Sequence, residues 1–205
     1  MESMEEIVFG TRNEAKVRQV AGALRPIGVR VKGLPEGAPL PAIEEDGETA
    51  GENARKKALA YSLALGTPVL SMDNALYFKG LHAGEQPGVH VRRIGNGDER
   101  PSDEALLEYY ASLIGRLGGK VEGRWEFGIC VATPQGKTKG TTILSPRIFT
   151  AVPSARMVPG YPLESLQIDP VSGKCVSDMT QEEQDAFWQR AIGKPLQEFV
   201  RNIEL

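Results

Sequence analysis

Residues 7–25 of this 205-residue chain read IVFGTRNEAKVRQVAGALR, and this stretch decides the fold class. Its first three residues are apolar, which is typical of a buried strand, and Gly10 then begins a short polar turn. The apolar spacing predicts a helix from about Asn13 to Arg25, with Asn13 as its N-cap and Pro26 ending it. A strand that leads through a tight turn into a helix is typical of an α/β protein.

Apolar spacing and turn residues predict the other elements in the same way. The predicted strands are 29–31, 69–72, 125–132 and 138–152, and the predicted helices are 49–66, 102–117, 181–191 and 195–203. The two longest strands are expected to run antiparallel. Strand–helix units at the start, a hairpin in the middle and helices at the end predict an α/β fold with a mixed sheet. We find no repeat or long linker, so a single domain over residues 1–205 is expected.

The charge and the amino terminus of the chain exclude several classes of partner. There are 24 Lys and Arg against 27 Asp and Glu, a net charge of −3, and no basic run that would grip a nucleic-acid backbone. Residues 1–6 are acidic where a signal peptide is basic, and no apolar run approaches the roughly 18 residues that cross a bilayer. We therefore expect no nucleic-acid polymer and no membrane as partner, and a cytoplasmic location.

The turn after the first strand is the first of three candidate chemical sites. Backbone N–H groups at a helix start attract anions, and Lys16, one turn into the helix, can reach a phosphate. The spacing is close to that of a P-loop, but Ala15 and Val17 stand where that motif has glycine and serine or threonine. An ordinary capped helix with a solvated lysine is the alternative interpretation.

The other two candidates are acidic. Residues 44–48, EEDGE, precede the second helix, and Mg²⁺ is usually held by one or two carboxylates together with phosphate oxygens and water. Acidic residues before a helix also simply complement its dipole. Asp73 and Asn74 are expected at the carboxyl end of a buried strand, where open α/β sheets bind ligands. An ordinary turn is the alternative for that pair.

In their order and spacing, these motifs resemble those of the inosine triphosphate pyrophosphatase family, of which this chain looks like a divergent member. The matching positions are Thr11, Asn13 and Lys16 of T-x-N-x-x-K; Glu44, Glu45, Gly47, Thr49, Glu52, Asn53 and Ala54 of the acidic helix motif, with Lys57 after them; Asp73 of D-D-S-G; and Pro87, Gly88 and Arg93 of P-G-x-x-x-x-R. The resemblance extends from Ile7 to about Lys194.

The resemblance implies that the chain hydrolyses noncanonical purine nucleoside triphosphates (ITP, dITP, XTP) to the monophosphate and pyrophosphate, with Mg²⁺ as cofactor. This is a house-cleaning role in the nucleotide pool. It also implies an elongated mixed sheet with flanking helices that form two lobes around a central cleft, in a homodimer. By the same resemblance, Lys16 and Lys57 hold phosphate, Glu45 binds the metal, and Asp73 binds the metal or activates the attacking water. The implied substrate-binding residues are Thr11, Asn13, Lys16, Lys57, Asn74, Tyr161, Gln189 and Arg190.

Several positions depart from the family pattern. Met72, Asn74 and Ala75 replace an aspartate, the serine and the glycine of D-D-S-G, and Pro162, Gln184 and Gln189 replace the aspartate, lysine and histidine expected to read the base. Tyr161 keeps the aromatic ring of that segment, and Arg190 keeps its arginine. Two alternatives therefore stay open: a nucleotide-binding protein with weakened catalysis, and a pyrophosphatase for other modified nucleotides.

Overall fold

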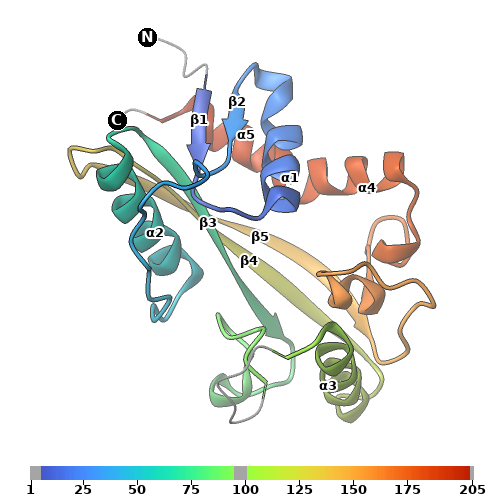
Figure 1. Cartoon of the computed structure of the whole chain (residues 1–205). Coiled ribbons are helices and arrows are strands. Elements are labelled where there is room, and N and C mark those ends of the chain that lie inside the picture. The colour runs from blue at the N-terminus through green and yellow to red at the C-terminus, as the bar shows by residue number, and fades with distance from the viewer. Residues whose placement is uncertain (1–5, 95–100, 204–205) are drawn as a thin grey trace. The chain divides into compact units, whose positions relative to one another are not determined.

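The computed structural model describes residues 6–94 and 101–203, and the side chain of Ala15 is not part of that description. The strands are β1 Glu6–Phe9, β2 Arg30–Lys32, β3 Val69–Phe78, β4 Lys120–Ala132, β5 Thr138–Thr150 and β6 Gln167–Ile168, in the sheet order β2-β1-β3-β4-β5-β6. Figure 1 labels β1 to β5. β1 pairs in parallel with β2 and β3, whereas β5 and β6 are antiparallel. The predicted α/β fold with a mixed sheet is confirmed.

The helices follow the strands in the order expected for this fold class. The α-helices are α1 Glu14–Leu24, α2 Ala50–Leu65, α3 Asp103–Arg116, α4 Gln181–Trp188 and α5 Lys194–Arg201. Short 3-10 helices are η1 Arg25–Ile27, η2 Ala83–Glu85, η3 Pro162–Leu166 and η4 Val176–Asp178, and η5 Gln189–Gly193 is a π-helix. None of the helices in the described ranges is long and apolar enough to span a membrane.

The chain forms two compact units. Unit 1 contains Met1–Asn74, Glu126–Ile143 and Trp188–Leu205, and unit 2 contains Ala75–Trp125 and Leu144–Phe187. The chain passes from one unit to the other within β3, β4 and β5, and again at the end of α4. The single domain expected over residues 1–205 stays a prediction.

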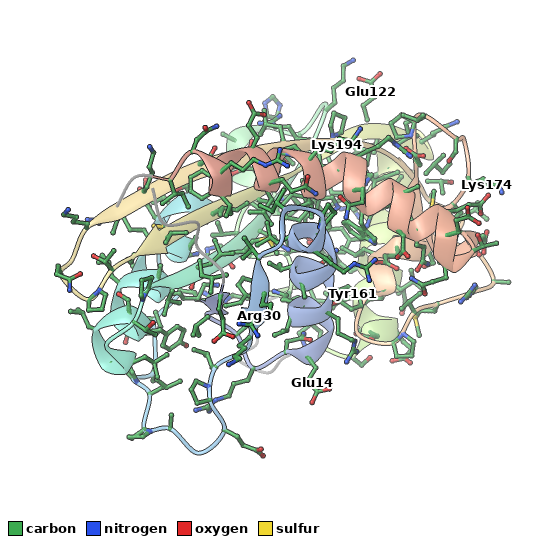
Figure 2. The ribbon with its side chains drawn as sticks, turned by 90° about the horizontal axis from the view of Figure 1, so that it is seen from above. Glu14, Arg30, Glu122, Tyr161, Lys174 and Lys194 are labelled. Carbon is green, nitrogen blue, oxygen red and sulfur yellow. The ribbon has the colours of Figure 1, made fainter. Side chains whose placement is uncertain are left out.

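Helix α1 begins where its cap predicts. Asn13 Oδ1 accepts a hydrogen bond from the backbone N–H of Lys16 at 3.3 Å, as an N-cap does. In the first turn Glu14 lies 3.3 Å from Arg18, one helical turn further on (Figure 2). At its other end α1 packs beside α5 (Figure 1), where the Gln197 amide donates to Ala23 O at 2.7 Å.

Helix α2 lies against β4 through small side chains. Its N-cap Thr49 accepts from Glu52 N at 3.1 Å, and Gly66 ends it in the left-handed conformation with φ 65°. Ala54 and Ala58 are fully buried in a cluster with Cys130 and Ala132 of β4. The lack of bulk on both surfaces allows a close approach of helix and strand.

The first turn of α2 touches the backbone of β4 directly. A Cβ atom at Gly128 of β4 would lie 2.2 Å from the carbonyl carbon of Ala50, so only glycine leaves room there. This contact sets where α2 starts on the sheet. It therefore also sets the positions of Asn53 and Lys57, which follow within the next two turns.

Unit 2 has its own apolar core around α3. Ser102 caps the helix, accepting from Ala105 N at 3.2 Å, so α3 begins beside the first residue of the predicted helix 102–117. The largest fully buried side chains of this core are Leu76, Leu106, Tyr110, Ile114, Phe149 and Leu166. The Tyr110 hydroxyl donates to Val91 O at 2.8 Å, which satisfies a polar group that would otherwise be costly to bury.

Strand β3 differs most from its prediction. The pattern ends it at Met72, with Asp73 and Asn74 beyond it, but the strand continues to Phe78. The prediction was wrong because an Asp-Asn pair favours a turn only when nothing else satisfies its backbone groups. Here the strand has neighbours on both edges, β1 and β4, and Leu76 exchanges backbone hydrogen bonds of 2.9 and 3.0 Å with Gly88.

Other boundaries move by less. β2 begins at Arg30 rather than at 29, and β4 begins at Lys120 rather than at 125. β4 and β5 are neighbours joined by a short turn at 133–137, as a hairpin requires. The two predicted C-terminal helices were wrongly separated, because the π-helix η5 joins α4 directly to α5. Pro195 lies in the first turn of α5, immediately after the π-helix η5.

Candidate active site

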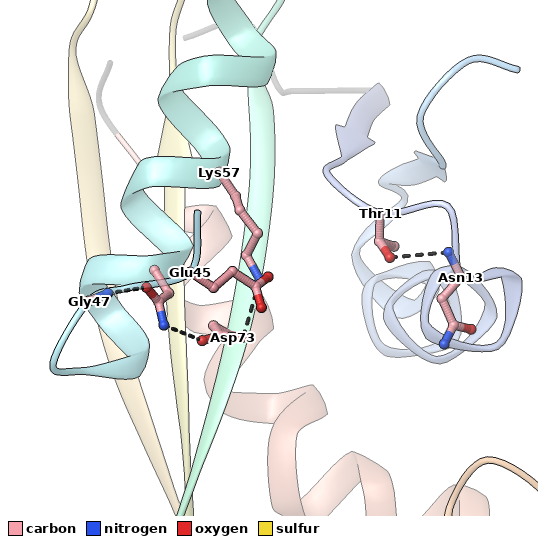
Figure 3. A network of polar contacts seen from close by, with 7 residues as sticks. Thr11, Asn13, Glu45, Gly47, Lys57 and Asp73 are labelled. Atoms are coloured by element: carbon pink, nitrogen blue, oxygen red, sulfur yellow. Dashed lines mark hydrogen bonds and ion pairs between the residues drawn. The ribbon is translucent and has the colours of Figure 1, made fainter. Parts of the chain in front are cut away.

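The turn after β1 lies beside the first residues of β3. Gly10 N donates to Leu70 O at 2.7 Å, which continues the parallel pairing of the two strands into the turn. Thr11 Oγ1 accepts from Asn13 N at 3.1 Å (Figure 3), and Thr11 O accepts from Leu34 N at 3.1 Å. Thr11 and Asn13, both predicted to bind substrate, thus also shape the turn that carries Lys16.

A cavity of about 460 Å³ adjoins this turn, within unit 1. It is lined by Phe9, Gly10, Thr11, Arg12, Lys16, Leu34, Leu40, Pro41, Ala42, Glu45, Lys57, Tyr61 and Met72. Its size lies in the ordinary range for a small-molecule site. Four residues that the sequence singles out, Thr11, Lys16, Glu45 and Lys57, thus line the same cavity.

At this cavity, two carboxylates share one ammonium group. Lys57 Nζ lies 2.9 Å from Glu45 Oε1 and 3.2 Å from Asp73 Oδ1 (Figure 3). The Lys57 and Asp73 side chains are only 11% and 15% exposed, while that of Glu45 is 47% exposed. Water therefore screens the pair with Asp73 less than the pair with Glu45. The structure brings together both predicted metal ligands, although they are 28 residues apart in sequence.

Only one residue of the acidic run contributes to this cluster. Asp46 instead pairs with Lys56, whose hydrogen bond lowers the pKa of that carboxyl. Glu48 N donates to Glu52 Oε2 at 2.8 Å, which ties the end of the run to the first turn of α2. In residues 6–94 and 101–203 no group of three or more His, Cys, Asp or Glu side chains could hold a metal ion. Glu45 and Asp73 are therefore a two-carboxylate arrangement.

The residues that flank Asp73 contribute differently. Met72 is 7% exposed and lines the cavity, where it offers no oxygen. Within the described residues, Ser71 Oγ and Asn74 Oδ1 are buried and make no hydrogen bond. A Cβ at Gly10 would lie 2.2 Å from that Ser71 oxygen, so a side chain at position 10 would require Ser71 to move. The predicted contact of Asn74 with substrate stays a prediction.

Asn53 is a residue of this site that the sequence reasoning matched to a motif without giving it a role. Its side chain is 1% exposed and joins the acidic run to β3. Oδ1 accepts from Gly47 N at 2.8 Å, and Nδ2 donates to Asp73 Oδ2 at 3.0 Å. The signal available in the sequence was an asparagine four residues before Lys57, on the same face of the helix.

The residues predicted to contact the base lie elsewhere in the chain. Tyr161, half-buried, precedes η3 in unit 2 (Figure 2), whereas Gln189 and Arg190 lie in η5 of unit 1. Within unit 1, Gln189 Nε2 donates to Gly22 O at 3.0 Å, and its Oε1 accepts from Gln197 at 3.2 Å. The Gln189 amide thus already has partners within its own unit.

Glu164, two residues beyond Pro162, has a raised pKa. Burial raises the pKa of Glu164 to about 7, and the nearby Arg147 guanidinium opposes that rise. Arg147 itself is 4% exposed and lies 4.3 Å from the centre of the Phe187 ring. Glu164 therefore changes charge near neutral pH, within unit 2.

Comparison with known proteins shows the family to which the chain belongs. The profile of the Ham1 family matches residues 7–193. This chain belongs to the Ham1 family. The membership confirms the resemblance that the motifs suggest. Residues 1–6, α5 and the residues after α5 lie outside the matched range.

Individual proteins similar to this chain are consistent with its membership of the Ham1 family. A protein of Geobacillus kaustophilus named dITP/XTP pyrophosphatase is 30% identical over 188 residues, 92% of this chain and 90% of its own length. A protein of Syntrophobacter fumaroxidans with the same name is 36% identical over 151 residues, 69% of this chain but less than two thirds, 62%, of its own length. The structure of the Staphylococcus aureus Ham1 protein matches with a TM-score of 0.75 and 23% identity, over 96% of this chain and 98% of that one, and so supports the fold.

Proposed function

We propose that this chain hydrolyses noncanonical purine nucleoside triphosphates, such as ITP, dITP and XTP, to the monophosphate and pyrophosphate. The observation that carries the proposal is the Lys57 ammonium shared by Glu45 and Asp73 beside a cavity that Lys16 also lines. Membership of the Ham1 family and the names of the two relatives support it.

The basic residues at the cavity suit a polyphosphate. Lys16 follows a turn at the start of α1, where backbone N–H groups and the helix dipole favour negative charge. An ammonium group acts on phosphate oxygens as a point charge and needs no fixed geometry. In this proposal Lys16 therefore binds the phosphate chain, and Lys57, which lines the same cavity, neutralises part of the phosphate charge.

The donor set also fits Mg²⁺. Glu45 and Asp73 supply oxygens that already converge on one cation, the Lys57 ammonium group. Mg²⁺ is a hard ion that takes one or two carboxylates together with phosphate oxygens and water. When bound, Mg²⁺ would neutralise phosphate charge and help to orient the substrate. Met72 adds no oxygen ligand, so in this proposal the carboxylates assigned to the ion among the described residues are Glu45 and Asp73.

Asp73 has the position of the acid–base group. Its carboxylate is largely buried, with one oxygen toward Lys57 and the other toward Asn53. In the proposed reaction the oxygen of a water molecule bonds to the α-phosphorus and the bond from that phosphorus to the bridging oxygen breaks. Pyrophosphate leaves, and Asp73 accepts the proton of the water.

The alternative of a nucleotide-binding protein with weak catalysis has specific support. Met72 removes one carboxylate of the family pattern, and the Gln189 amide bonds to Gly22 and Gln197. A pyrophosphatase for other modified nucleotides is the further alternative. Roles for Tyr161, Gln189 and Arg190 at the base, a homodimer and a cytoplasmic location stay predictions from the sequence.

One experiment separates these functions. Purified protein with Mg²⁺ is incubated with a panel of nucleoside triphosphates that includes ITP, XTP, ATP, GTP and modified pyrimidines, and pyrophosphate release is measured. Turnover that is fastest with ITP, dITP or XTP supports the proposal. Binding of these nucleotides without release of pyrophosphate would favour the nucleotide-binding protein, and preference for a modified pyrimidine would favour the other enzyme.

A further inference from the structure

Asn53 joins the two segments that carry the carboxylates of the site. It lies in the first turns of α2 and is 1% exposed, so its hydrogen bond to Gly47 is buried and its hydrogen bond to Asp73 is partly buried. We propose that Asn53 is a positioning residue for the reaction: it fixes the position of Asp73 relative to the loop that carries Glu45, and it does not touch substrate. This inference rests on the proposed function.

The two hydrogen bonds fix the carboxamide in one orientation. Oδ1 accepts from Gly47 N at 2.8 Å, so Nδ2 must face the other way, where it donates to Asp73 Oδ2 at 3.0 Å. Each oxygen of Asp73 then has a different donor, because Oδ1 accepts from Lys57 at 3.2 Å. Two donors on two oxygens set the plane of the carboxylate as well as its position.

Gly47 shows how closely the loop is held to Asn53. A Cβ atom at position 47 would lie 2.6 Å from Asn53 Oδ1 and 2.9 Å from the Cβ of Glu52. Gly47 is buried, and its N–H is the donor that Asn53 accepts. Because Glu45 is only two residues earlier, the same hydrogen bond restrains the loop that presents its carboxylate to Lys57.

An asparagine meets both requirements at this position, whereas aspartate, alanine and leucine do not. An aspartate could still accept from Gly47 N, but it would place a second carboxylate against Asp73. Alanine or leucine would leave the buried N–H of Gly47 without its acceptor, which costs free energy. The amide therefore supplies one acceptor and one donor and adds no charge of its own beside the reacting group.

The principal test compares two deletions of buried polar groups on the same helix. Asn53→Ala removes the proposed positioning contacts, and Ser62→Ala is the matched control. Ser62 is fully buried and hydrogen-bonds the carbonyl groups of Leu59 and Thr133, away from the cavity. Both variants are assayed for pyrophosphate release from ITP, well below their unfolding temperatures, over a range of ITP and Mg²⁺ concentrations.

Positioning and a merely structural role predict different results. We expect Asn53→Ala to lower kcat by about 10- to 100-fold, the usual effect of removing a group that orients a ligand of the site. The KM for ITP is expected to change by less than about 3-fold, because the triphosphate is bound by lysines. Ser62→Ala is expected to keep the wild-type kcat. Equal kcat values for folded Asn53→Ala and wild type would overturn the inference.

An exchange of the two side chains tests the contact itself. Asn53→Asp is expected to lower the urea midpoint of unfolding, because two carboxylates would then meet. In the double variant Asn53→Asp/Asp73→Asn, the amide at position 73 can donate to the carboxylate at position 53, so the midpoint is expected to recover while turnover stays low. A double variant no more stable than the sum of its single changes predicts would show that the two side chains do not interact, and would overturn the inference.

The failure of the inference is distinguishable from failure of the proposed function. If wild type releases no pyrophosphate from any nucleotide, the proposed function fails and Asn53 loses its role with it. If wild type is active and Asn53→Ala matches it, only the role of Asn53 fails.

Discussion

Lys57 Nζ lies 3.2 Å from Oδ1 of Asp73, and this ion pair connects α2 to the middle of β3. The same ammonium lies 2.9 Å from Glu45, so one cation balances two carboxylates. We expect Lys57→Met to lower the free energy of unfolding by about 2 kcal/mol, because it leaves two neighbouring carboxylates without their donor. Urea denaturation at pH 7 measures this change.

Lys56→Met is the matched control for that prediction. Lys56 pairs with Asp46 at the surface, where an ion pair contributes about 0–1 kcal/mol. Millimolar Mg²⁺ is expected to recover part of the stability of Lys57→Met, since a divalent ion can take the place between the carboxylates, and to leave Lys56→Met unchanged. Equal loss in the two variants would show that Lys57 does not bridge Glu45 and Asp73.

Asp73→Asn is expected to reduce pyrophosphate release by about 10²-fold or more, the effect of losing a positioned acid–base carboxylate. The amide keeps the size of the side chain, so the strand is expected to stay folded. The measurement is the initial rate of pyrophosphate release from ITP, with circular dichroism to confirm the fold. Wild-type rates from a folded variant would remove Asp73 from the reaction.

Glu45→Gln is expected to raise the Mg²⁺ concentration required for half-maximal activity. The reason is that Met72 supplies no oxygen, so Glu45 and Asp73 are the two carboxylates at Lys57 in the part of the chain that the structure describes. Glu48→Gln serves as the control, because that side chain is exposed and follows Gly47 in the same acidic loop. A metal titration that is identical for Glu45→Gln and wild type would place the ion elsewhere.

Base selectivity is expected to be weaker than in a relative with the full family motif. Discrimination between 6-oxo and 6-amino purines requires donors and acceptors that the wrong base leaves unpaired. Here Gln184 donates to Val176 O at 3.3 Å and Gln189 donates to Gly22 O at 3.0 Å, each within its own unit. The ratio of kcat/KM for ITP to that for ATP measures selectivity. A ratio equal to that of the relative would contradict this expectation.

The raised pKa of Glu164 predicts a pH dependence of stability. Burial raises this pKa from 4.5 to about 7, so between these values the folded state holds a proton that the unfolded state has released. Stability from this group is therefore present below about pH 4.5 and is lost as the pH rises to about 7. Glu164→Gln mimics the protonated form, so it is expected to match wild type near pH 4.5 and to be more stable at pH 8. Parallel curves of unfolding free energy against pH for the two proteins would contradict the prediction.

Much of the helical structure could be predicted from short stretches of sequence. The caps Asn13, Thr49 and Ser102 each accept a backbone hydrogen bond from a residue three positions later, and the helices begin directly after them. A cap acts over a few residues, so its effect is visible without the rest of the fold. The lengths of β3 and β4 could not be found in this way, because these two strands bond to each other across a long intervening stretch of chain.

The candidate active site was likewise predictable from the sequence only in part. Residue types and their positions pointed to Lys16, the acidic run 44–48 and Asp73, since phosphate and Mg²⁺ require cations and carboxylates. The resemblance to the family singled out Glu45 and Lys57. Tertiary structure alone decided that Lys57 lies between the two carboxylates and that Asn53 holds one of them. These contacts join residues 12, 16 and 20 positions apart. They depend on the pairing of β3 with β1 and on the close packing of α2 against Gly128, which no local pattern encodes.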